Sequence, residues 1–142
     1  MNRTLAIVKP DAVAAGRAGQ IIAQLESAGL RPRAVRMLTM TRAQARSFYE
    51  VHRDRPFYDS LVAFMTSGPC IPIVLEAPGA VGRLRRAIGA TDPAEAAPGT
   101  VRRLHAESKE RNAIHGSDSD PNARREIGFF FAECEVPDGG RG

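Results

Sequence analysis

The 142-residue sequence lacks the features that mark several large classes of protein. No apolar run in it approaches the ~20 residues that a membrane-spanning helix requires. The first residues, Met1-Asn2-Arg3, lead directly into a strand-like run, without the apolar core and small-residue cleavage site of a secretory leader. We therefore expect a cytoplasmic protein with no membrane partner. The only two cysteines, Cys70 and Cys134, lie in apolar segments without metal-like spacing, and we expect both to be buried, reduced thiols.

The sequence also lacks the short motifs that identify common catalytic sites. It contains neither the phosphate-binding loop G-x-x-x-x-G-K-[ST] nor the dinucleotide fingerprint G-x-G-x-x-G. It has no H-E-x-x-H and no C-x-x-C, which argues against a tightly held structural metal. The nucleophile elbow of the serine hydrolases is absent as well. Candidates for chemistry must therefore be sought outside these motifs.

Lysine is scarce in this basic chain. The net charge is +4, and of the 20 basic residues only Lys9 and Lys109 are lysines. A positive net charge is consistent with either a solvated basic surface or a site for an anionic ligand such as phosphate or nucleic acid. A lysine in an arginine-biased chain indicates a site that favours a compact ammonium group, although base composition of the genome produces the same bias.

Composition and hydrophobic patterning together predict one domain with four strands. Apolar residues make up 43% of the chain, as in ordinary globular proteins. We expect residues 1–136 to form the domain and residues 137–142 to be a disordered tail. Helices separate the strands, so the order predicts an α+β fold, a ferredoxin-like α/β sandwich with a four-stranded antiparallel sheet covered by helices. The expected strands are residues 4–8, 33–40, 70–76 and 127–133.

Three local signals refine this prediction. Thr41-Arg42-Ala43-Gln44 matches a capping box and predicts a helix start. Asp120-Pro121 resembles an N-cap followed by proline at the first helical position, which predicts a short helix that carries Glu126. Pro72 lies inside the third expected strand, which favours an edge position or a bulge because proline cannot donate to the ladder.

A long irregular stretch, residues 90–119, contains the strongest candidate for chemistry. Such stretches in compact domains are usually functional. His115 lies there in a run rich in glycine and hydroxyl groups, and Gly116 beside it would leave room for a phosphate. A neutral imidazole attacks a phosphoryl group when an acceptor fixes its tautomer, and Glu126, oriented by Ser117, is the candidate acceptor. The alternative is that His115 caps a turn and titrates in water.

Other side chains are candidates for a cleft that binds a polyphosphate. Lys9 follows the first expected strand, and Arg85 and Arg102 lie further along the chain, so the three could neutralise phosphates together with Mg²⁺. Phe57 could stack on a nucleobase. The alternatives are that the arginines are solvated and that Phe57 is a core aromatic. The remaining candidates for the same cleft are Tyr49, Thr91 and Asn112.

One octet of this stretch carries a specific resemblance. Asn112-Ala113-Ile114-His115-Gly116-Ser117-Asp118-Ser119 resembles the active-site signature of nucleoside diphosphate kinases. Five further segments resemble other motifs of that family in the family's order, and the similarity runs from about Thr4 to Val136. Locally, Arg103-Leu104-His105 departs from the family's usual acidic and aromatic residues. The five segments are Ala6-Ile7-Val8-Lys9-Pro10-Asp11, Arg55-Pro56-Phe57, Thr66-Ser67-Gly68-Pro69, Gly89-Ala90-Thr91-Asp92-Pro93-Ala94 and Pro98-Gly99-Thr100-Val101-Arg102.

The resemblance implies a ping-pong transfer of the γ-phosphoryl group from a nucleoside triphosphate, such as ATP, to a nucleoside diphosphate. His115 would be the phosphorylated nucleophile, oriented by Glu126 and Ser117. Stacking without contact to the base edge would give broad base tolerance. The other matching positions would be Tyr49 beside the imidazole, Lys9 and Asn112 at the ribose and nearby phosphate, Phe57 under the base, and Arg85, Thr91 and Arg102 on the phosphates.

The resemblance also implies a metal and an assembly. Mg²⁺ would be held mainly by the nucleotide phosphates, with Asp118 near it through water. The chain would form dimers that assemble into tetramers or hexamers.

Two other functions compete with this interpretation. A basic nucleic-acid-binding module shares the order of strands and helices, and Gly128-Phe129-Phe130-Phe131 faintly resembles an aromatic strand motif. That run is uniformly apolar, however, and lacks the alternation of stacking and core residues. A non-catalytic interaction protein that kept the fold is the third interpretation, and the complete set of candidate site residues argues against it.

Overall fold

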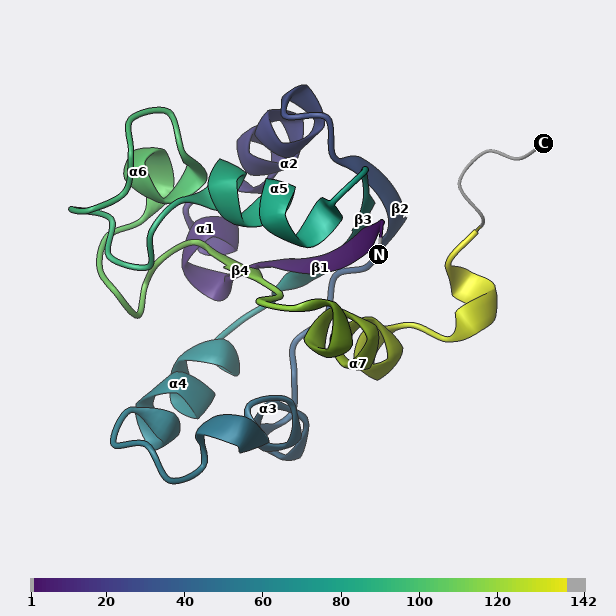
Figure 1. Cartoon of the computed structure of the whole chain (residues 1–142). Helices are drawn as coiled ribbons and strands as arrows, with labels where there is room; N and C mark the ends of the chain where they lie inside the picture. Colours follow the sequence, from purple (N-terminus) through teal and green to yellow (C-terminus); the bar gives the residue numbers. More distant parts are fainter. Residues whose placement is uncertain (1, 138–142) are drawn as a thin grey trace.

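The computed structural model describes residues 2–137 and shows helices on both faces of one four-stranded antiparallel sheet (Figure 1). The strand order across the sheet is β2-β3-β1-β4. This arrangement confirms the predicted α+β, ferredoxin-like fold. From residue 138 onward, the predicted disordered tail lies outside the described residues. The strands are β1 (Arg3–Val8), β2 (Arg31–Val35), β3 (Ile71–Glu76) and β4 (Ile114–Gly116).

Strand β1 occupies the centre of the sheet and is buried on both faces. It pairs with β3 on one side and with β4 on the other. Side chains alternate along a strand, so Leu5 and Ile7 pack on one face while Ala6 and Val8 pack on the other. The continuous apolar run at the start of the sequence is therefore a central strand.

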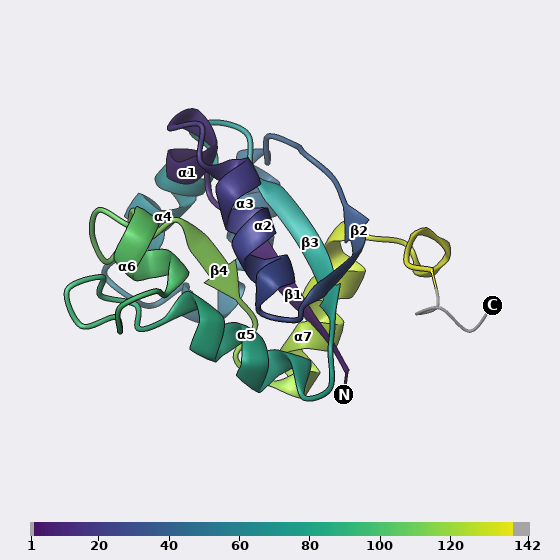
Figure 2. The ribbon, with the colours of Figure 1, turned by 90° about the horizontal axis from the view of Figure 1, so that it is seen from above.

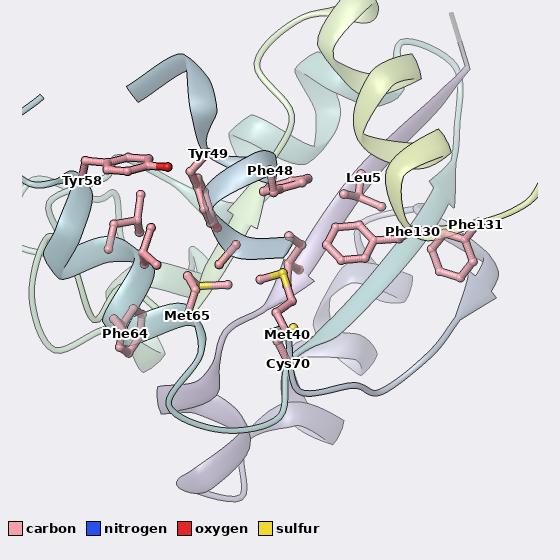
Figure 3. Close-up of a cluster of buried hydrophobic side chains, with 14 of the residues drawn as sticks. Leu5, Met40, Phe48, Tyr49, Tyr58, Phe64, Met65, Cys70, Phe130 and Phe131 are labelled. Atoms are coloured by element: carbon pink, nitrogen blue, oxygen red, sulfur yellow. The ribbon is translucent and has the colours of Figure 1, made fainter. Parts of the chain in front are cut away.

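Each face of the sheet has its own helical layer. Helices α2 (Ala18–Ser27) and α5 (Ala80–Ile88) cover one face, and α3 (Arg42–Phe48), α4 (Tyr58–Met65) and α7 (Asp120–Phe130) lie on the other (Figures 1 and 2). Aromatic side chains fill the core under the second layer (Figure 3). No described helix is both long enough and apolar enough to cross a membrane. The short elements are α1 (Pro10–Ala14), η1 (Glu50–His52), α6 (Val101–His105) and η2 (Glu133–Glu135).

The prediction of a last strand over residues 127–133 is wrong. Helix α7 continues to Phe130, and the fourth strand is instead the short β4, which contains His115. Residues at positions 123, 126, 127 and 130 share a helical face, and this spacing buries Phe130 in the core. The helix begins one residue earlier than predicted, because the Ser119 side chain, not Asp120, caps it by accepting from the Asn122 N–H.

The interpretation of Pro72 as an edge or bulge residue is also wrong. Strand β3 lies between β2 and β1, and the register shift falls in β2 between Pro32 and Ala34. The Pro72 carbonyl accepts from the Arg36 N–H at 3.3 Å. In an antiparallel ladder the N–H and C=O of a residue point to the same neighbour, so the missing donor of Pro72 faces the chain beyond the end of β2. A central strand tolerates proline there because the regular ladder has already ended.

The remaining local predictions have mixed outcomes. The capping box at Thr41 is present, with reciprocal hydrogen bonds to Gln44. The second strand is Arg31–Val35, shorter and earlier than the predicted 33–40. Cys70 is buried as predicted, but Cys134 is exposed, because α7 ends before it and leaves it in the short η2 turn.

Gly89 is required by the fold at the end of α5. Its φ is +86°, and a Cβ there would lie 2.6 Å from Thr100 Oγ1 and 2.8 Å from Thr100 Cβ. Thr100 caps α6 by accepting from the Arg103 N–H, so the glycine allows α5 and α6 to meet. The Gly89 carbonyl also accepts from Arg102 at 3.0 Å, which ties this junction to a candidate site residue.

We predict that Gly89→Ala lowers the free energy of unfolding by about 2–4 kcal/mol, because strain at positive φ adds to the steric clash. Urea denaturation measures this change. Gly99→Ala is the matched control, since Gly99 has a φ of +85° but nothing within 4 Å of its Cβ position. The control should lose only about 1–2 kcal/mol of unfolding free energy, which is the cost of placing alanine at positive φ. Equal losses in the two variants would contradict the assigned packing role.

Candidate active site

His115 is the middle residue of β4 and lies opposite Ile7 of β1. Its Nε2 is 2.7 Å from Glu126 Oε1 on α7, and the Ser117 hydroxyl donates to the same oxygen at 2.7 Å. An ionised carboxylate only accepts hydrogen bonds, so this contact selects the tautomer with the proton on Nε2. The lone pair is then on Nδ1, which makes that nitrogen the available nucleophile.

Two aromatic rings of α3 and its C-terminal cap surround the imidazole. The ring centroids of Phe48 and Tyr49 lie 5.5 Å and 6.4 Å from that of His115, both with edge-to-face geometry. The Tyr49 hydroxyl is buried and has no hydrogen-bond partner among residues 2–137. Burial raises the pKa of Tyr49 above its usual value, so the hydroxyl keeps its proton and can donate to a ligand beside the imidazole.

The backbone just before His115 forms a strained turn. Ala113 has a φ of 74°, and the Ile114 N–H donates to the Asn112 carbonyl at 2.9 Å, which defines a γ-turn. The Ala113 N–H donates to Asp11 Oδ2 at 3.1 Å, and the Ala113 carbonyl accepts from the Lys9 N–H at 2.9 Å. These two bonds to the beginning of α1 hold the strained residue in place.

Gly116 lines the cavity beside His115, so its predicted role of leaving room for a phosphate stays a prediction, and it has a second role in packing. A Cβ at this position would lie 3.0 Å from Ile88 Cδ1 and 3.1 Å from Leu84 Cδ2. The glycine therefore lets α5 pack closely on β4. Because Arg85 follows Leu84 on α5, this close packing brings the guanidinium to the same end of the sheet as His115.

Three cations gather around this end of the sheet. Burial and the charge of Arg102 lower the pKa of Lys9 to about 8. Burial and the charge of Arg85 lower the pKa of Arg102 to about 10. The positive charges are thus close enough to repel one another, and an anion placed among them would relieve this repulsion. Sequence reasoning selected these three residues separately, and the fold brings them together.

A cavity of about 870 Å³ lies in front of the histidine. Phe57 at its mouth is 47% exposed, which contradicts the alternative that this ring belongs to the core. The predicted site residues that line the cavity are Lys9, Tyr49, Phe57, Arg85, Thr91, His115, Asp118 and Glu126.

Three predicted site residues lie behind the cavity wall. Ser117 is buried and bonded to Glu126. Arg102 donates to the carbonyls of Gly89 and Ile114 at 3.0 and 2.8 Å, so it also holds the backbone around the site. Asn112 donates to the Lys109 carbonyl at 2.9 Å, and its buried Oδ1 has no partner in the described part of the chain.

Asp118 is an acidic oxygen donor that lines the cavity. A 2.6 Å hydrogen bond from Asn122 Nδ2, together with the charge of Arg85, holds the pKa of Asp118 below its usual value. Residues 2–137 contain no group of three or more histidine, cysteine or acidic side chains that could hold a metal. The donor set therefore fits a metal that is coordinated chiefly by phosphate oxygens rather than a resident ion.

Sequence reasoning missed several residues of the site. Asp11 accepts the hydrogen bond from the Ala113 N–H in the γ-turn. The sequence around Pro10 and Asp11 contains no pattern that indicates this contact. Lys109 and Glu110 line the mouth of the cavity. Lys109 had one signal, since it is the second of only two lysines in the chain.

Comparison with known proteins agrees with this geometry. A family model described as nucleoside diphosphate kinase matches residues 2–136. The nucleoside diphosphate kinase of Chlorobium luteolum is 56% identical over 136 residues, covering 96% of this chain and 97% of the relative. The crystal structure of the Aquifex aeolicus nucleoside diphosphate kinase superposes with a TM-score of 0.94 at 44% identity, covering 96% of this chain and 99% of the other.

A further solved structure carries a bound nucleotide. It is a halophilic nucleoside diphosphate kinase from Halobacterium salinarum in complex with CDP, with a TM-score of 0.93 and 39% identity, covering 99% of this chain and 95% of the other. The fold and the histidine cavity thus define a class of nucleotide-handling α+β proteins. The chain belongs to the nucleoside diphosphate kinase family.

We predict that Asp11→Ala lowers the free energy of unfolding by about 1–3 kcal/mol, because it leaves the buried Ala113 N–H without an acceptor. Thermal or urea denaturation measures the loss. Asp11→Asn keeps an acceptor oxygen and should lose markedly less stability. If the two variants are equally destabilised, the hydrogen bond to the γ-turn is not what Asp11 contributes.

Proposed function

We propose that this chain transfers the γ-phosphoryl group of a nucleoside triphosphate to a nucleoside diphosphate through a phosphohistidine on His115. The observation that carries the proposal is the chain of hydrogen bonds from Ser117 to Glu126 to His115, set at a cavity flanked by cations. Membership of the nucleoside diphosphate kinase family supports the same reaction and substrates.

The first half-reaction forms a bond between His115 Nδ1 and the γ-phosphorus. The Nδ1 lone pair attacks, the bond from phosphorus to the bridging oxygen breaks, and a nucleoside diphosphate leaves with that electron pair. The imidazole becomes positively charged, and the Glu126 carboxylate at 2.7 Å from Nε2 stabilises that charge. In the second half-reaction a terminal oxygen of an acceptor diphosphate attacks the phosphorus and releases the neutral imidazole.

The cations and polar groups around the cavity position the nucleotide. Arg85, Arg102 and Thr91 would hold the phosphates, with Tyr49 beside the imidazole. Lys9 and Asn112 would contact the ribose hydroxyls and the adjacent phosphate. The exposed ring of Phe57 would stack on the base, a contact that tolerates every base.

The proposed cofactor is Mg²⁺, bound to the nucleotide phosphates and reached by Asp118 through water. When bound, it neutralises negative charge on the phosphates. The ionised carboxylate of Asp118 and the lack of a larger acidic cluster in residues 2–137 support a metal shared with the substrate.

Assembly into a homo-oligomer is also part of the proposal. Strand β2 is an edge strand of the sheet; Val35 at its end and Met37 two residues beyond it are 51% and 60% exposed. Exposed apolar side chains on an open edge favour association with another chain. This surface supports a dimer as the unit of the tetramers or hexamers that the resemblance implies.

The nucleic-acid-binding alternative is not favoured. Besides the basic charge and the order of strands and helices, it drew on Gly128-Phe129-Phe130-Phe131 as an aromatic strand. The structure places the first three of these residues on α7, where Phe130 packs in the core. This run therefore forms no strand surface on which nucleobases could stack.

We predict that incubation with γ-labelled ATP and Mg²⁺ transfers the label to the protein in an acid-labile, base-stable bond. His115→Ala should abolish labelling because no other imidazole has the Glu126 contact. Phosphoamino-acid analysis after alkaline hydrolysis identifies phosphohistidine as the labelled amino acid. Retention of the label in His115→Ala would overturn the assignment, and denaturation curves for the variant exclude unfolding as the cause.

We further predict a decline in kcat/KM as the pH rises through about 8, the lowered pKa of Lys9. Below this pH the ammonium group is charged and attracts phosphate, and above it the neutral amine does not. Lys9→Gln should lower kcat/KM by about tenfold or more at pH 7. Its pH profile should lack the decline near pH 8. An unchanged alkaline decline in Lys9→Gln would show that another group is responsible.

A further inference from the structure

The segment between α6 and β4 forms a hydrogen-bonded loop that contributes to the cavity wall. The Arg111 N–H donates to Ser108 Oγ at 3.0 Å, and the Glu107 N–H donates to the Arg111 carbonyl at 2.9 Å. Asn112 fixes the Lys109 carbonyl, and the Arg111 guanidinium lies 5.6 Å from the centre of the Phe64 ring on α4. The loop is thus docked on α4 with a defined shape, and Lys109 and Glu110 form its cavity-facing part.

Glu110 is anchored by a hydroxyl group of α4. Ser60 Oγ lies 2.8 and 3.0 Å from the two oxygens of the Glu110 carboxylate. Ser60 follows Phe57 by three residues, and Leu61 follows it by four, so these side chains share one face of the helix. Phe57, Leu61 and Glu110 all line the cavity. The anchored carboxylate therefore lines the same cavity as the ring on which the base would stack.

The anchored carboxylate retains hydrogen-bonding capacity. A serine hydroxyl carries one proton, whereas an ionised carboxylate has about four lone-pair sites. Within residues 2–137, Ser60 is the one side chain bonded to Glu110. The negative charge of Glu110 also raises the pKa of Lys9 and so opposes the lowering that burial causes. Glu110 thus lines the same cavity as the ring of Phe57 and the ammonium group proposed for the ribose.

We propose that Glu110 determines nucleoside preference by accepting a hydrogen bond from the 2-amino group of guanine or from the ribose 2′-hydroxyl of the nucleoside. This proposal rests on the proposed function. It adds a preference among nucleosides to the broad base tolerance expected from stacking on Phe57. Guanosine carries both donors, whereas adenosine, cytidine and uridine share the ribose 2′-hydroxyl but lack the 2-amino group. The preferred acceptor is therefore guanosine diphosphate, and Ser60 is a positioning residue for the carboxylate.

The test measures discharge of the phosphorylated enzyme by acceptors that differ in one donor. Enzyme labelled from ATP and freed of nucleotide is mixed with GDP, inosine diphosphate, which lacks the 2-amino group, or 2′-deoxy-GDP, which lacks the 2′-hydroxyl. We expect GDP to discharge the wild-type protein about tenfold faster than one of the two analogues, as for a hydrogen bond to a charged group. The slower analogue identifies the donor that Glu110 binds.

Variants separate this role from general damage to the site. Glu110→Ala should bring the rate ratio close to one, and Ser60→Ala should reduce it, while both proteins still become labelled by ATP. Glu107→Ala is the matched control, because Glu107 lies in the same loop but pairs with Arg111 outside the cavity. Its rate ratio should equal that of the wild type.

Three results would overturn the inference. They are rate ratios near one for both analogues in the wild type, a wild-type ratio preserved in Glu110→Ala, and an equal loss in Glu107→Ala. Failure of the wild-type protein to become labelled would instead refute the proposed function itself. The labelling step and the discharge step thus distinguish the two failures.

Discussion

The pairing of β4 with β1 is the interaction on which the site depends. Three residue pairs join the strands, and His115 lies opposite Ile7 in the middle of this short ladder. Such a short strand has little stability of its own, and neighbouring contacts hold it. Asp11 and the Lys9 backbone bind the strained Ala113 at its start, and the Ser117 N–H donates to the Leu5 carbonyl at its end. The helical layers on the two faces of the sheet then pack against β4.

The two helical layers contribute different chemistry to the same cavity. The layer of α3 and α7 supplies the carboxylate of Glu126 and the aromatic wall around the imidazole. The opposite layer supplies Arg85, because Gly116 lets α5 approach β4 closely. A nucleophile, its orienting acid and the opposing cations thus come from segments far apart in the sequence. This division explains how a phosphate site can form without a glycine-rich loop, since side chains replace the backbone amides as donors.

Several residues serve the fold and the proposed chemistry together. Arg102 carries a positive charge beside Lys9, yet it also donates to two backbone carbonyls. Gly89, whose carbonyl accepts one of these hydrogen bonds, permits the junction of α5 and α6. Substitutions here would change stability and nucleotide binding together. Glu110 differs, because its carboxylate is bonded to a surface hydroxyl and its removal leaves the core and the histidine intact.

The sequence by itself determined the buried strand β1, the capped helix at Thr41, the histidine octet and the identity of the candidate cations. These features depend on local periodicity, capping chemistry and motif order, which a single segment carries. Only the tertiary structure decided that residues 127–130 continue a helix, that Pro72 lies in a central strand and that Gly116 faces α5. It also brought Asp11 to Ala113 and Ser60 to Glu110. The reason is that apolar runs fit either a strand or a helix, while contacts between distant segments depend on how the layers pack.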